Sequence, residues 1–300
     1  MSMELRQLRY FVAVAEHLGF GRAAKHLHLA QQSLSQQIGA LERDLGVRLF
    51  DRDTRGTRLT DAGRVFLPEA RAVLARADAA AAVARRAGRG EIGRLDLAFL
   101  TSTANYMLPP VVKALRERFP GLELTTHNVP IDELVAGLRD GRFDAGFTRP
   151  PLVPDLATRV LTTEPVCAVL PTGHPLAGRA ELRLADLADE DWVLSPRGSW
   201  PPWHDKYDRD FAAAGFTPRV VQRADGAANL LGLVAAGVGV TRLARSANSI
   251  RRGGVVFVPL AGDRADTVVA WPPDRDGPAR RNLLDVAADL AATGDLTRWG

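Results

Sequence analysis

Residues 29–52, LAQQSLSQQIGALERDLGVRLFDR, decide the fold of the N-terminal part of the chain. Leu34, Ile38, Leu41 and Leu45 recur in this stretch at intervals of four, three and four, which places them on one face of a helix. The opposite face carries amides and hydroxyls and hardly a charge, whereas solvated helix faces usually carry charged residues. This polar face is suited to hydrogen bonding with another molecule.

Shorter predicted elements surround this helix. Helical patterns over residues 4–17 and 22–28 precede it, and only Leu29-Ala30 separate the second pattern from it. A short helix, a tight turn and a longer helix form the helix-turn-helix arrangement. Apolar pairs then flank a polar tip at 51–57, which predicts a small hairpin or wing.

The polar face of the longer helix predicts contact with DNA. Gln pairs bidentately with adenine, Ser meets either a donor or an acceptor, and recognition helices present their N-terminal residues to the bases. Arginines on a wing tip reach the phosphate backbone or the minor groove. The alternative is an amide-rich face that merely confers solubility. The expected DNA-binding residues are Gln31, Gln32, Ser33, Ser35, Gln36, Arg52 and Arg55.

Charge is unevenly distributed along the 300 residues, whose net charge is +4. Residues 1–90 hold 15 Arg and Lys and nine Asp and Glu, a net +6, and the remaining 210 hold 24 and 26, a net −2. Because 36 of the 39 basic residues are Arg, genome composition explains the choice of Arg over Lys. It does not explain the basic N-terminal third, which favours nucleic-acid binding there.

A long helix is predicted after the wing, with Thr60 as its N-cap and its end near Arg86. Alternating intervals of four and three are typical of a seam between two helices, so we expect a dimer. The alternative is a helix that packs on its own chain. The seam residues are Phe66, Ala70, Val73, Ala77, Ala80 and Ala84.

The remaining chain has an α/β pattern. Strands over 95–100, 122–128 and 143–147 alternate with helices over 106–118 and 132–139, which predicts a parallel sheet with crossover helices. A second α/β set follows, so two lobes with a cleft between them are expected. Its strands are expected at 163–170, 192–195, 219–222, 238–244, 255–260 and 267–271, and its helices at 203–214, 227–236 and 279–292.

The stretch from Leu5 to Gly63 resembles the winged helix-turn-helix of LysR-type transcriptional regulators. The motifs are the Ala pair of the second helix, the S-Q-Q-I…LE…LG…LF-R run and LT-x-AG at the start of the long helix. Three later motifs resemble the regulatory domain of the subgroup that controls degradation of aromatic compounds. These are FDAGFTR at 143–149, PTGHPLAG at 171–178 and LLGLVAAGVGV at 230–240.

The resemblance implies an all-α winged helix-turn-helix at 1–60, a dimerising linker helix at 61–90 and an effector-binding regulatory domain at 91–300. The regulatory domain is expected to be a two-lobed α/β domain like type 2 periplasmic binding proteins. Lobe I is expected at about 91–162 plus 266–300, and lobe II at about 163–265. The implied function is transcription activation switched by a small-molecule effector, with operator DNA, RNA polymerase and further copies of the chain, as dimer and tetramer, as partners.

Two departures from the family pattern lie in the recognition helix. Ala30-Gln31-Gln32 stands where the family often has Ser-Gln-Pro, so the usual cap hydroxyl is missing. Gln36 stands where the family often has Arg, which predicts weaker phosphate or guanine contact and a different operator. Gln31, Ser33, Ser35 and Arg52 match positions that contact DNA in relatives.

An effector site is expected at the carboxyl ends of the first-lobe strands, where open α/β sheets bind ligands. Thr101, Ser102 and Thr103 precede a predicted helix and offer hydroxyls near free backbone N–H groups, while Arg149 offers a charge. In relatives of the aromatic-degradation subgroup, Ser102 and Arg149 match effector-contacting positions. The alternatives are plain helix capping for the hydroxyls and a surface or interlobe salt bridge for Arg149.

The second lobe is expected to supply Trp203 to the same site, with packing as the alternative role for the Trp200 and Trp203 pair. Ile131 and Gly226 replace polar residues that some muconate-responsive relatives carry there, which predicts a less polar pocket. The expected effector is an aromatic or unsaturated carboxylate.

Other functions find little support. No run of about 18 apolar residues predicts a membrane span, and the N-terminus has no apolar signal core, so a cytoplasmic protein is expected. Cys167 is the single cysteine and is expected in the core, and no His cluster has metal-ligand spacing. With no nucleophile elbow or P-loop, neither an enzyme nor a cofactor is expected. The main alternative is a DNA-binding repressor whose α/β part only oligomerises; a ligand-binding protein or an enzyme is less favoured.

Overall fold

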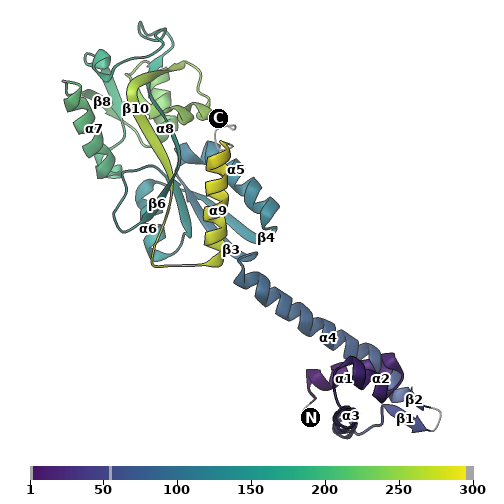
Figure 1. The fold of residues 1–300 in the computed structure, drawn as a ribbon. Coiled ribbons are helices and arrows are strands. Elements are labelled where there is room, and N and C mark those ends of the chain that lie inside the picture. The colour runs from purple at the N-terminus through teal and green to yellow at the C-terminus, as the bar shows by residue number, and fades with distance from the viewer. Residues whose placement is uncertain (1–2, 54–55, 295–300) are drawn as a thin grey trace. The chain divides into compact units, whose positions relative to one another are not determined.

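The computed structural model describes residues 3–53 and 56–294 (Figure 1). The chain divides into two compact units, Met1–Arg85 and Arg86–Gly300. In the described residues, no helix is long and apolar enough to cross a membrane.

The first unit contains the predicted helices and hairpin. The second helix begins and ends two residues earlier than the sequence pattern indicated. The hairpin strands extend into residues 51–57, which were expected at the polar tip. The elements are α1 (Leu5–His17), α2 (Phe20–His26), α3 (Gln31–Leu45), β1 (Phe50–Asp53), β2 (Gly56–Leu59) and the greater part of α4 (Asp61–Gly88).

The apolar face of α3 builds the core of the first unit. Leu34, Ile38 and Leu41 are fully buried there, in one cluster with Phe11 and Phe50, whose ring centroids lie 5.3 Å apart. The intervals of four and three therefore did identify the buried face of the helix. Its polar residues are left for the opposite side.

Helix α4 begins as predicted, because the Thr60 hydroxyl accepts the N–H of Gly63 at 3.0 Å. Only the first part of the expected seam, however, packs on its own unit, and the rest is left open. The Phe66 ring packs 5.1 Å from that of Phe11, and Ala70 is buried in the same core, so the seam begins by packing on its own chain. From Val73 onward the seam side chains are half-buried or exposed.

The second unit has the predicted α/β order, with three short 3-10 helices in addition. Its elements are β3 (Ile92–Phe99), α5 (Thr101–Arg118), β4 (Gly121–Asn128), α6 (Ile131–Asp140), β5 (Ala145–Thr148), β6 (Ala157–Pro171), η1 (Leu184–Leu187), β7 (Asp191–Leu194), η2 (Arg197–Ser199), α7 (Pro201–Ala213), β8 (Arg219–Arg223), α8 (Gly226–Ala235), β9 (Thr241–Ala244), η3 (Arg245–Ile250), β10 (Val255–Trp271) and α9 (Pro278–Thr293).

The parallel sheet predicted for the first lobe is confirmed for β3, β4 and β5, and these strands belong to a larger, mixed sheet. Its order is β4-β3-β5-β10-β6-β9, and only β3, β4 and β5 are parallel to one another, while β10 runs antiparallel to β5 and β6. The segments expected as two strands, 255–260 and 267–271, are one long strand, β10. Its pairing with β6 continues across a register shift between Pro259 and Arg264, as antiparallel pairs do at bulges. Both long strands run through the two lobes.

Side-chain alternation along β3 explains how helices cover both faces of the first lobe. Leu95, Leu97 and Phe99 belong to one core with residues of α5 and α9, while Ala98 belongs to another with residues of α6. In the second lobe the core is centred on Trp192, which is fully buried 4.8 Å from the ring of Phe211.

Helix α5 begins five residues before the predicted start at Tyr106. Pro109 and Pro110 therefore lie inside the helix and not in its first turn. A proline lacks the N–H of an interior helical bond, which is why the prediction began the helix later. Burial of Met107, Val111 and Leu115 against the sheet holds the helix together across this interruption.

Candidate functional site

The N-terminal end of α3 presents the predicted polar surface. Gln31, Gln32, Ser33 and Gln36 are exposed, and the first three form the first turn of the helix. Ala30 is the N-cap and has no capping side chain, as its sequence implied. The backbone N–H groups of this turn are therefore not satisfied by a side-chain cap.

Arg52 lies in strand β1, paired with Thr57, and not at the tip of the wing. Its Nη1 donates to the Ser35 hydroxyl at 2.8 Å, and its guanidinium carbon lies 3.9 Å from the centroid of the Phe20 ring. The structure thus joins two predicted DNA contacts, Ser35 and Arg52, that are 17 residues apart in sequence. Arg55, which was also expected at the tip, lies outside the described residues.

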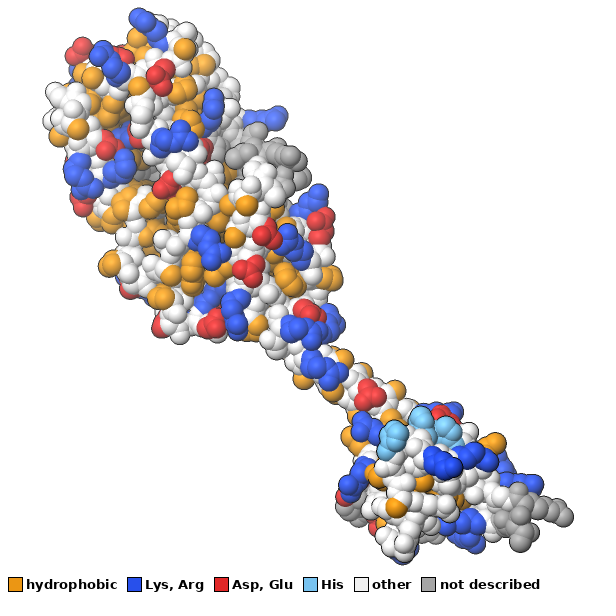
Figure 2. Space-filling model, in the orientation of Figure 1, with side chains coloured by type: hydrophobic (Ala, Val, Ile, Leu, Met, Phe, Trp, Pro, Cys, Tyr) orange, Lys and Arg blue, Asp and Glu red, His pale blue; other side chains and the backbone are white. Residues whose placement is uncertain are grey.

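Basic side chains and histidines lie together on one face of the first unit (Figure 2). The rings of His17 and His26 have centroids 4.5 Å apart. Arg22 donates from Nε to the His17 carbonyl at 2.6 Å and from Nη2 to the Leu18 carbonyl at 2.5 Å, so it caps the end of α1. In the part of the chain that the structure describes, no group of three or more His, Cys, Asp or Glu is placed to hold a metal ion.

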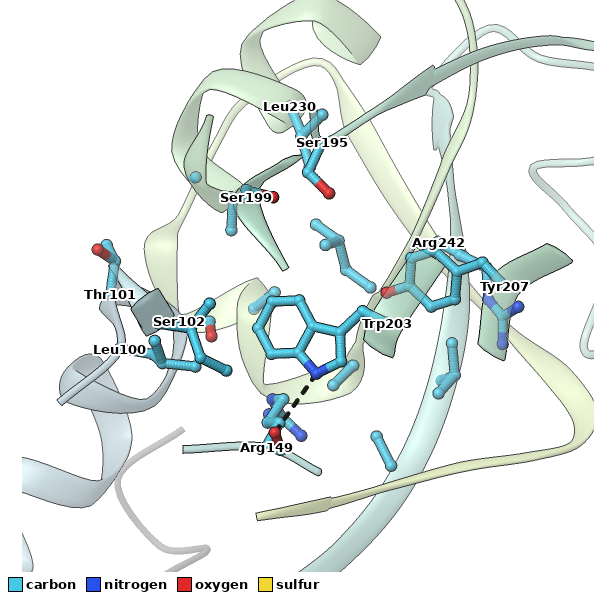
Figure 3. A pocket seen from close by; sticks show the side chains of 18 of the residues that line it. Leu100, Thr101, Ser102, Arg149, Ser195, Ser199, Trp203, Tyr207, Leu230 and Arg242 are labelled. Carbon is cyan, nitrogen blue, oxygen red and sulfur yellow. Dashed lines mark hydrogen bonds between the residues drawn. The ribbon is translucent and has the colours of Figure 1, made fainter. Parts of the chain in front are cut away.

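A cavity of about 780 Å³ opens between the two lobes, at the carboxyl ends of β3, β4 and β5 (Figure 3). Thr101, Ser102, Arg149 and Trp203 line it, so four of the five expected effector residues are brought together. Most of the wall is apolar. The apolar lining residues include Leu100, Val129, Pro130, Ile131, Pro150, Pro151, Val166, Leu194, Leu230, Leu243 and Ala247.

Thr103, the fifth expected residue, does not line the cavity. Its side chain is fully buried, and its Oγ1 lies 2.7 Å from the Phe147 carbonyl and 3.0 Å from the Leu100 carbonyl. Because α5 begins at Thr101, the third hydroxyl of the triplet points back into the protein at the first turn of the helix. Thr103 therefore links the first turn of α5 to β5 through its hydrogen bond to Phe147.

Thr101 and Ser102 stand in the first turn of α5, at the positive end of its dipole. The Thr101 hydroxyl donates to Asn128 Oδ1 at 2.9 Å. Ser102 is half-buried at the cavity wall. The Ser102 hydroxyl has no hydrogen-bond partner among the described residues. Of the two hydroxyls, it is therefore the one that can bind a ligand without breaking a bond within the protein.

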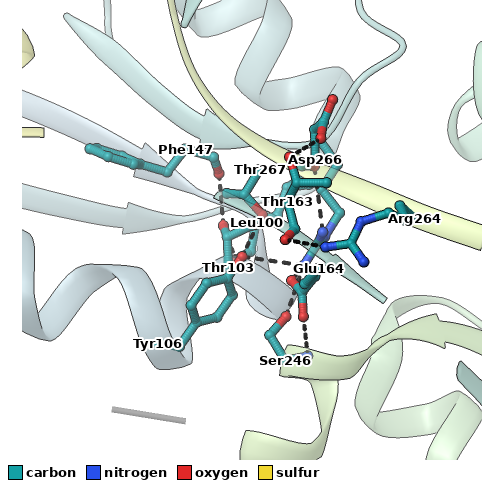
Figure 4. A network of polar contacts seen from close by, with 11 residues as sticks. Leu100, Thr103, Tyr106, Phe147, Thr163, Glu164, Ser246, Arg264, Asp266 and Thr267 are labelled. Atoms are coloured by element: carbon teal, nitrogen blue, oxygen red, sulfur yellow. Dashed lines mark hydrogen bonds and ion pairs between the residues drawn. The ribbon is translucent and has the colours of Figure 1, made fainter. Parts of the chain in front are cut away.

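Arg149 is engaged in a network of polar contacts that joins the two lobes. Its Nη2 lies 2.7 Å from Glu164 Oε1, 2.8 Å from the Ser246 hydroxyl and 3.2 Å from the Tyr106 hydroxyl. Glu164 also accepts the Ser246 N–H at 2.5 Å (Figure 4). The side chains of Arg149 and Glu164 are only 12% and 14% exposed, so the charge of Arg149 is already balanced inside the protein.

The two tryptophans at the start of α7 have different environments: Trp200 is the N-cap of the helix and Trp203 lies in its first turn. The Trp203 ring lies in the cavity, and its Nε1 donates to the Arg149 carbonyl at 3.4 Å (Figure 3). Trp200 is buried in a core cluster of the first lobe and donates to the Pro151 carbonyl at 2.8 Å. Trp200 therefore has a packing role, whereas Trp203 packs partly against the same cluster and also faces the cavity.

Sequence reasoning missed a charged group behind Trp203. Lys206 and Tyr207 follow it by three and four residues, on the same face of α7, and Arg242 comes from β9. Asp210 contacts both cations, at 2.6 Å from Lys206 Nζ and 2.8 Å from Arg242 Nη1. Burial raises the pKa of Asp210, but these contacts outweigh burial and leave it below its usual range.

Signals for these residues were present in the sequence. Arg242 interrupts an apolar strand, and such a charge in a buried strand needs a partner; it is 2% exposed and also pairs with Asp263. Burial raises the pKa of the Tyr207 hydroxyl, so the cavity holds a neutral phenol at this point.

Ile131 and Gly226 both line the cavity, as their match to effector positions implied. Ile131 is buried and offers only carbon atoms. Gly226 has a φ of +74°, a conformation that other residues rarely adopt, so the larger polar residue of some relatives would be strained here. Both substitutions leave this wall less polar.

Comparison with known proteins supports one family along the chain. The model of the bacterial regulatory helix-turn-helix protein, lysR family, matches residues 5–64, and that of the LysR substrate binding domain matches residues 88–292. The transcriptional regulator IlvR of Caulobacter vibrioides is 39% identical over 299 residues, 98% of this chain and 100% of IlvR. The regulator YnfL of Escherichia coli is 38% identical over 289 residues, covering 94% and 97%.

A solved structure agrees with this relationship. Full-length CbnR complexed with its target DNA is 29% identical to this chain, with a TM-score of 0.78, and the match covers 96% of this chain and 100% of CbnR. The exposed start of α3, the wing and the two-lobed α/β unit thus occur in the order found in a DNA-bound regulator. The chain belongs to the LysR family of DNA-binding transcriptional regulators.

Proposed function

We propose that the protein is an effector-gated regulator whose ligand, an aromatic or unsaturated carboxylate, binds in the interlobe cavity. The observation that carries the proposal is the cavity itself, with its indole and aliphatic walls and a hydroxyl at the start of α5. Apolar walls with a few placed polar groups are typical of small-molecule sites.

The ligand carboxylate is assigned to Ser102 and the start of α5. The hydroxyl donates a hydrogen bond, and the helix dipole favours negative charge at this end. Arg149 contributes its charge only when the ligand carboxylate competes with Glu164, because the two side chains are paired at 2.7 Å. The aromatic part of the ligand lies against Trp203.

DNA recognition is assigned to the start of α3 and to Arg52. Gln31, Gln32, Ser33 and Gln36 are exposed there, and Arg52 is held beside Ser35. The CbnR complex supports operator DNA as the partner. The Hca operon transcriptional activator HcaR of Escherichia coli, 36% identical over 297 residues, supports activation as the response.

Self-association is assigned to α4 beyond the part that packs on its own unit. Val73 is 43% exposed, and Ala77, Ala80 and Ala84 follow it at helical spacing. A second copy of α4 would cover this stripe and place two recognition helices on two half-sites. A tetramer would then bend the DNA between its two dimers. RNA polymerase would contact the tetramer on this bent DNA.

The test is footprinting on the DNA upstream of the gene for this protein, with and without benzoate, salicylate and muconate. A protected region that shortens with one of these compounds supports the proposal. Ser102→Ala should abolish this response and leave the footprint without ligand intact. Ser199→Ala is the matched control, because the Ser199 hydroxyl also lines the cavity but already donates to the Pro196 carbonyl at 2.7 Å. A footprint indifferent to every compound would favour a repressor whose α/β unit only oligomerises.

A further inference from the structure

We propose a second ligand site, for a small oxyanion, at the N-terminus of α9. A cavity of about 240 Å³ lies there, separate from the interlobe cavity. It is lined by the first turn of α9 and by the segments at 87–95, 141–144 and 272–276, all within the second unit.

The unusual feature of this cavity is Arg280. Arg280 is one of the residues that line the cavity. It is only 8% exposed, and among the described residues it has no hydrogen-bond acceptor and no ion pair. The guanidinium nitrogens are not among the fully buried unpartnered atoms of the described residues, so they keep some contact with solvent, but a largely buried charge without a protein partner is still costly. An anion in the cavity would supply the missing partner.

The other arginines of the cavity show which charges are available. Arg94 pairs with Asp96 at 2.8 Å. Arg275 donates from Nη2 to the Arg139 carbonyl at 2.6 Å and interacts with the charge of Asp140, but within the described part of the chain it forms no close ion pair. Arg275 and Arg280 are therefore the two cations whose charge an oxyanion would balance, and forked guanidinium donors match oxyanions well.

The helix terminus adds a second source of positive potential. Helix α9 has 16 residues, with Gly277 as its N-cap and Pro278 in its first turn. The N–H groups of Ala279 and Arg280 have no acceptor among the residues described, and helix N-termini of this kind bind anions. The terminus and the unpartnered Arg280 are independent observations that favour the same ligand.

Two carboxylates also line the cavity and limit the charge that it accepts. Asp276 accepts the Gly277 N–H at 2.8 Å and pairs with Arg281 at 3.3 Å, and Asp144 accepts the Asp96 N–H at 2.8 Å. Both are engaged with groups of the protein. Their presence and the small volume favour one phosphate-sized anion over a larger polyanion.

The site lies where the chain leaves α4. Gly90 is buried at a φ of +69°, and a Cβ there would lie 2.4 Å from the Pro278 carbonyl carbon. Asn282 Nδ2 donates to the carbonyls of Arg89 and Gly90 at 2.9 and 3.1 Å. An anion that orders the first turn of α9 would therefore stabilise the segment that joins the linker helix to the regulatory unit.

The test is calorimetric titration of the full-length protein with inorganic phosphate at constant ionic strength, with chloride as the balancing salt. We expect saturable binding, weakened at least tenfold in Arg280→Gln and several-fold in Arg275→Gln. Lys113→Gln is the charge control, because Lys113 is exposed on α5, does not line this cavity and pairs only with Glu117 among the described residues; the affinity of this variant should stay within twofold. Parallel titrations with a sugar phosphate and with acetate distinguish free phosphate, a phosphorylated metabolite and a carboxylate as the source of the oxyanion.

Absence of saturable binding for all three probes would overturn the proposal, as would equal affinity in Arg280→Gln. If Arg280→Gln fails to fold, Arg275→Gln and Arg280→Lys decide: unchanged phosphate affinity in both would equally overturn it. Binding of the interlobe effector should be retained in Arg280→Gln, which separates this proposal from the one for the larger cavity.

Discussion

Replacement of Arg52 by alanine tests whether the wing strand and the recognition helix act as one DNA-binding surface. Arg52 has a hydrogen bond to Ser35 at 2.8 Å and lies over the Phe20 ring at 3.9 Å. These two contacts hold the guanidinium beside α3 before DNA arrives, with N–H groups left over for a phosphate. Arg52→Ala removes the proposed phosphate contact together with the hydrogen bond to Ser35 and the cation–π contact with Phe20.

The effect on DNA binding follows from counterion release. One phosphate contact contributes about 0.9 to the slope of log K against log salt, so a dimer that loses one contact per copy should lose about 1.8. The effect on stability is separate. An exposed cation–π contact contributes about 0.5–1 kcal/mol and a neutral-acceptor hydrogen bond about 1 kcal/mol, so the free energy of unfolding should fall by about 1–2 kcal/mol.

The assay is fluorescence anisotropy with operator DNA and with unrelated DNA across a series of salt concentrations. We expect Arg52→Ala to weaken binding to both DNAs and to flatten the salt dependence. Ser35→Ala keeps the charge and should change the slope less. Arg6→Ala is the charge control, because Arg6 is exposed on α1 and pairs with Glu4 at 3.2 Å. A slope that stays unchanged in Arg52→Ala, or that falls equally in Arg6→Ala, would refute the assignment.

Four further predictions concern stability and assembly. Glu164→Gln leaves the buried charge of Arg149 without its carboxylate, so denaturant titration should show a loss of about 3–5 kcal/mol, part of which saturating benzoate restores. Burial raises the pKa of the Cys167 thiol to about 11, so iodoacetamide at pH 8 should modify it slowly in the native protein and rapidly in urea; equal rates would contradict this. Burial lowers the pKa of His204 in the folded state, so the unfolded chain binds the proton more readily and stability should fall as pH drops below about 6.5; chemical denaturation from pH 7.5 to 5.5 should show a decrease that His204→Gln reduces. Val73→Glu places a charge on the exposed stripe of α4, so light scattering should show that the dimer dissociates. An unchanged molecular mass would show that α4 does not form the dimer interface.

The local elements of this protein follow from short-range sequence patterns. The spacing of Leu34, Ile38 and Leu41 identified the buried face of α3, and the Thr60 hydroxyl marked the start of α4. The first signal is the period of the helix itself and the second is a contact between residues three apart, which is why sequence alone sufficed. The chemistry of Ser102 and Trp203 could likewise be placed near a cavity, because strand ends in an α/β fold meet at one edge of the sheet.

The pairing of charges was decided only by the tertiary structure. Arg149 meets Glu164 and Ser246, which lie 15 and 97 residues further along, and these contacts balance a charge that the sequence left open to a ligand. The same long-range packing buries Ala70 in its own unit and leaves Arg280, which is 8% exposed, without an acceptor among the described residues. A residue's type sets what it can bind, but the low-dielectric surroundings and the groups within hydrogen-bond reach decide what it does bind, and these come from distant parts of the chain.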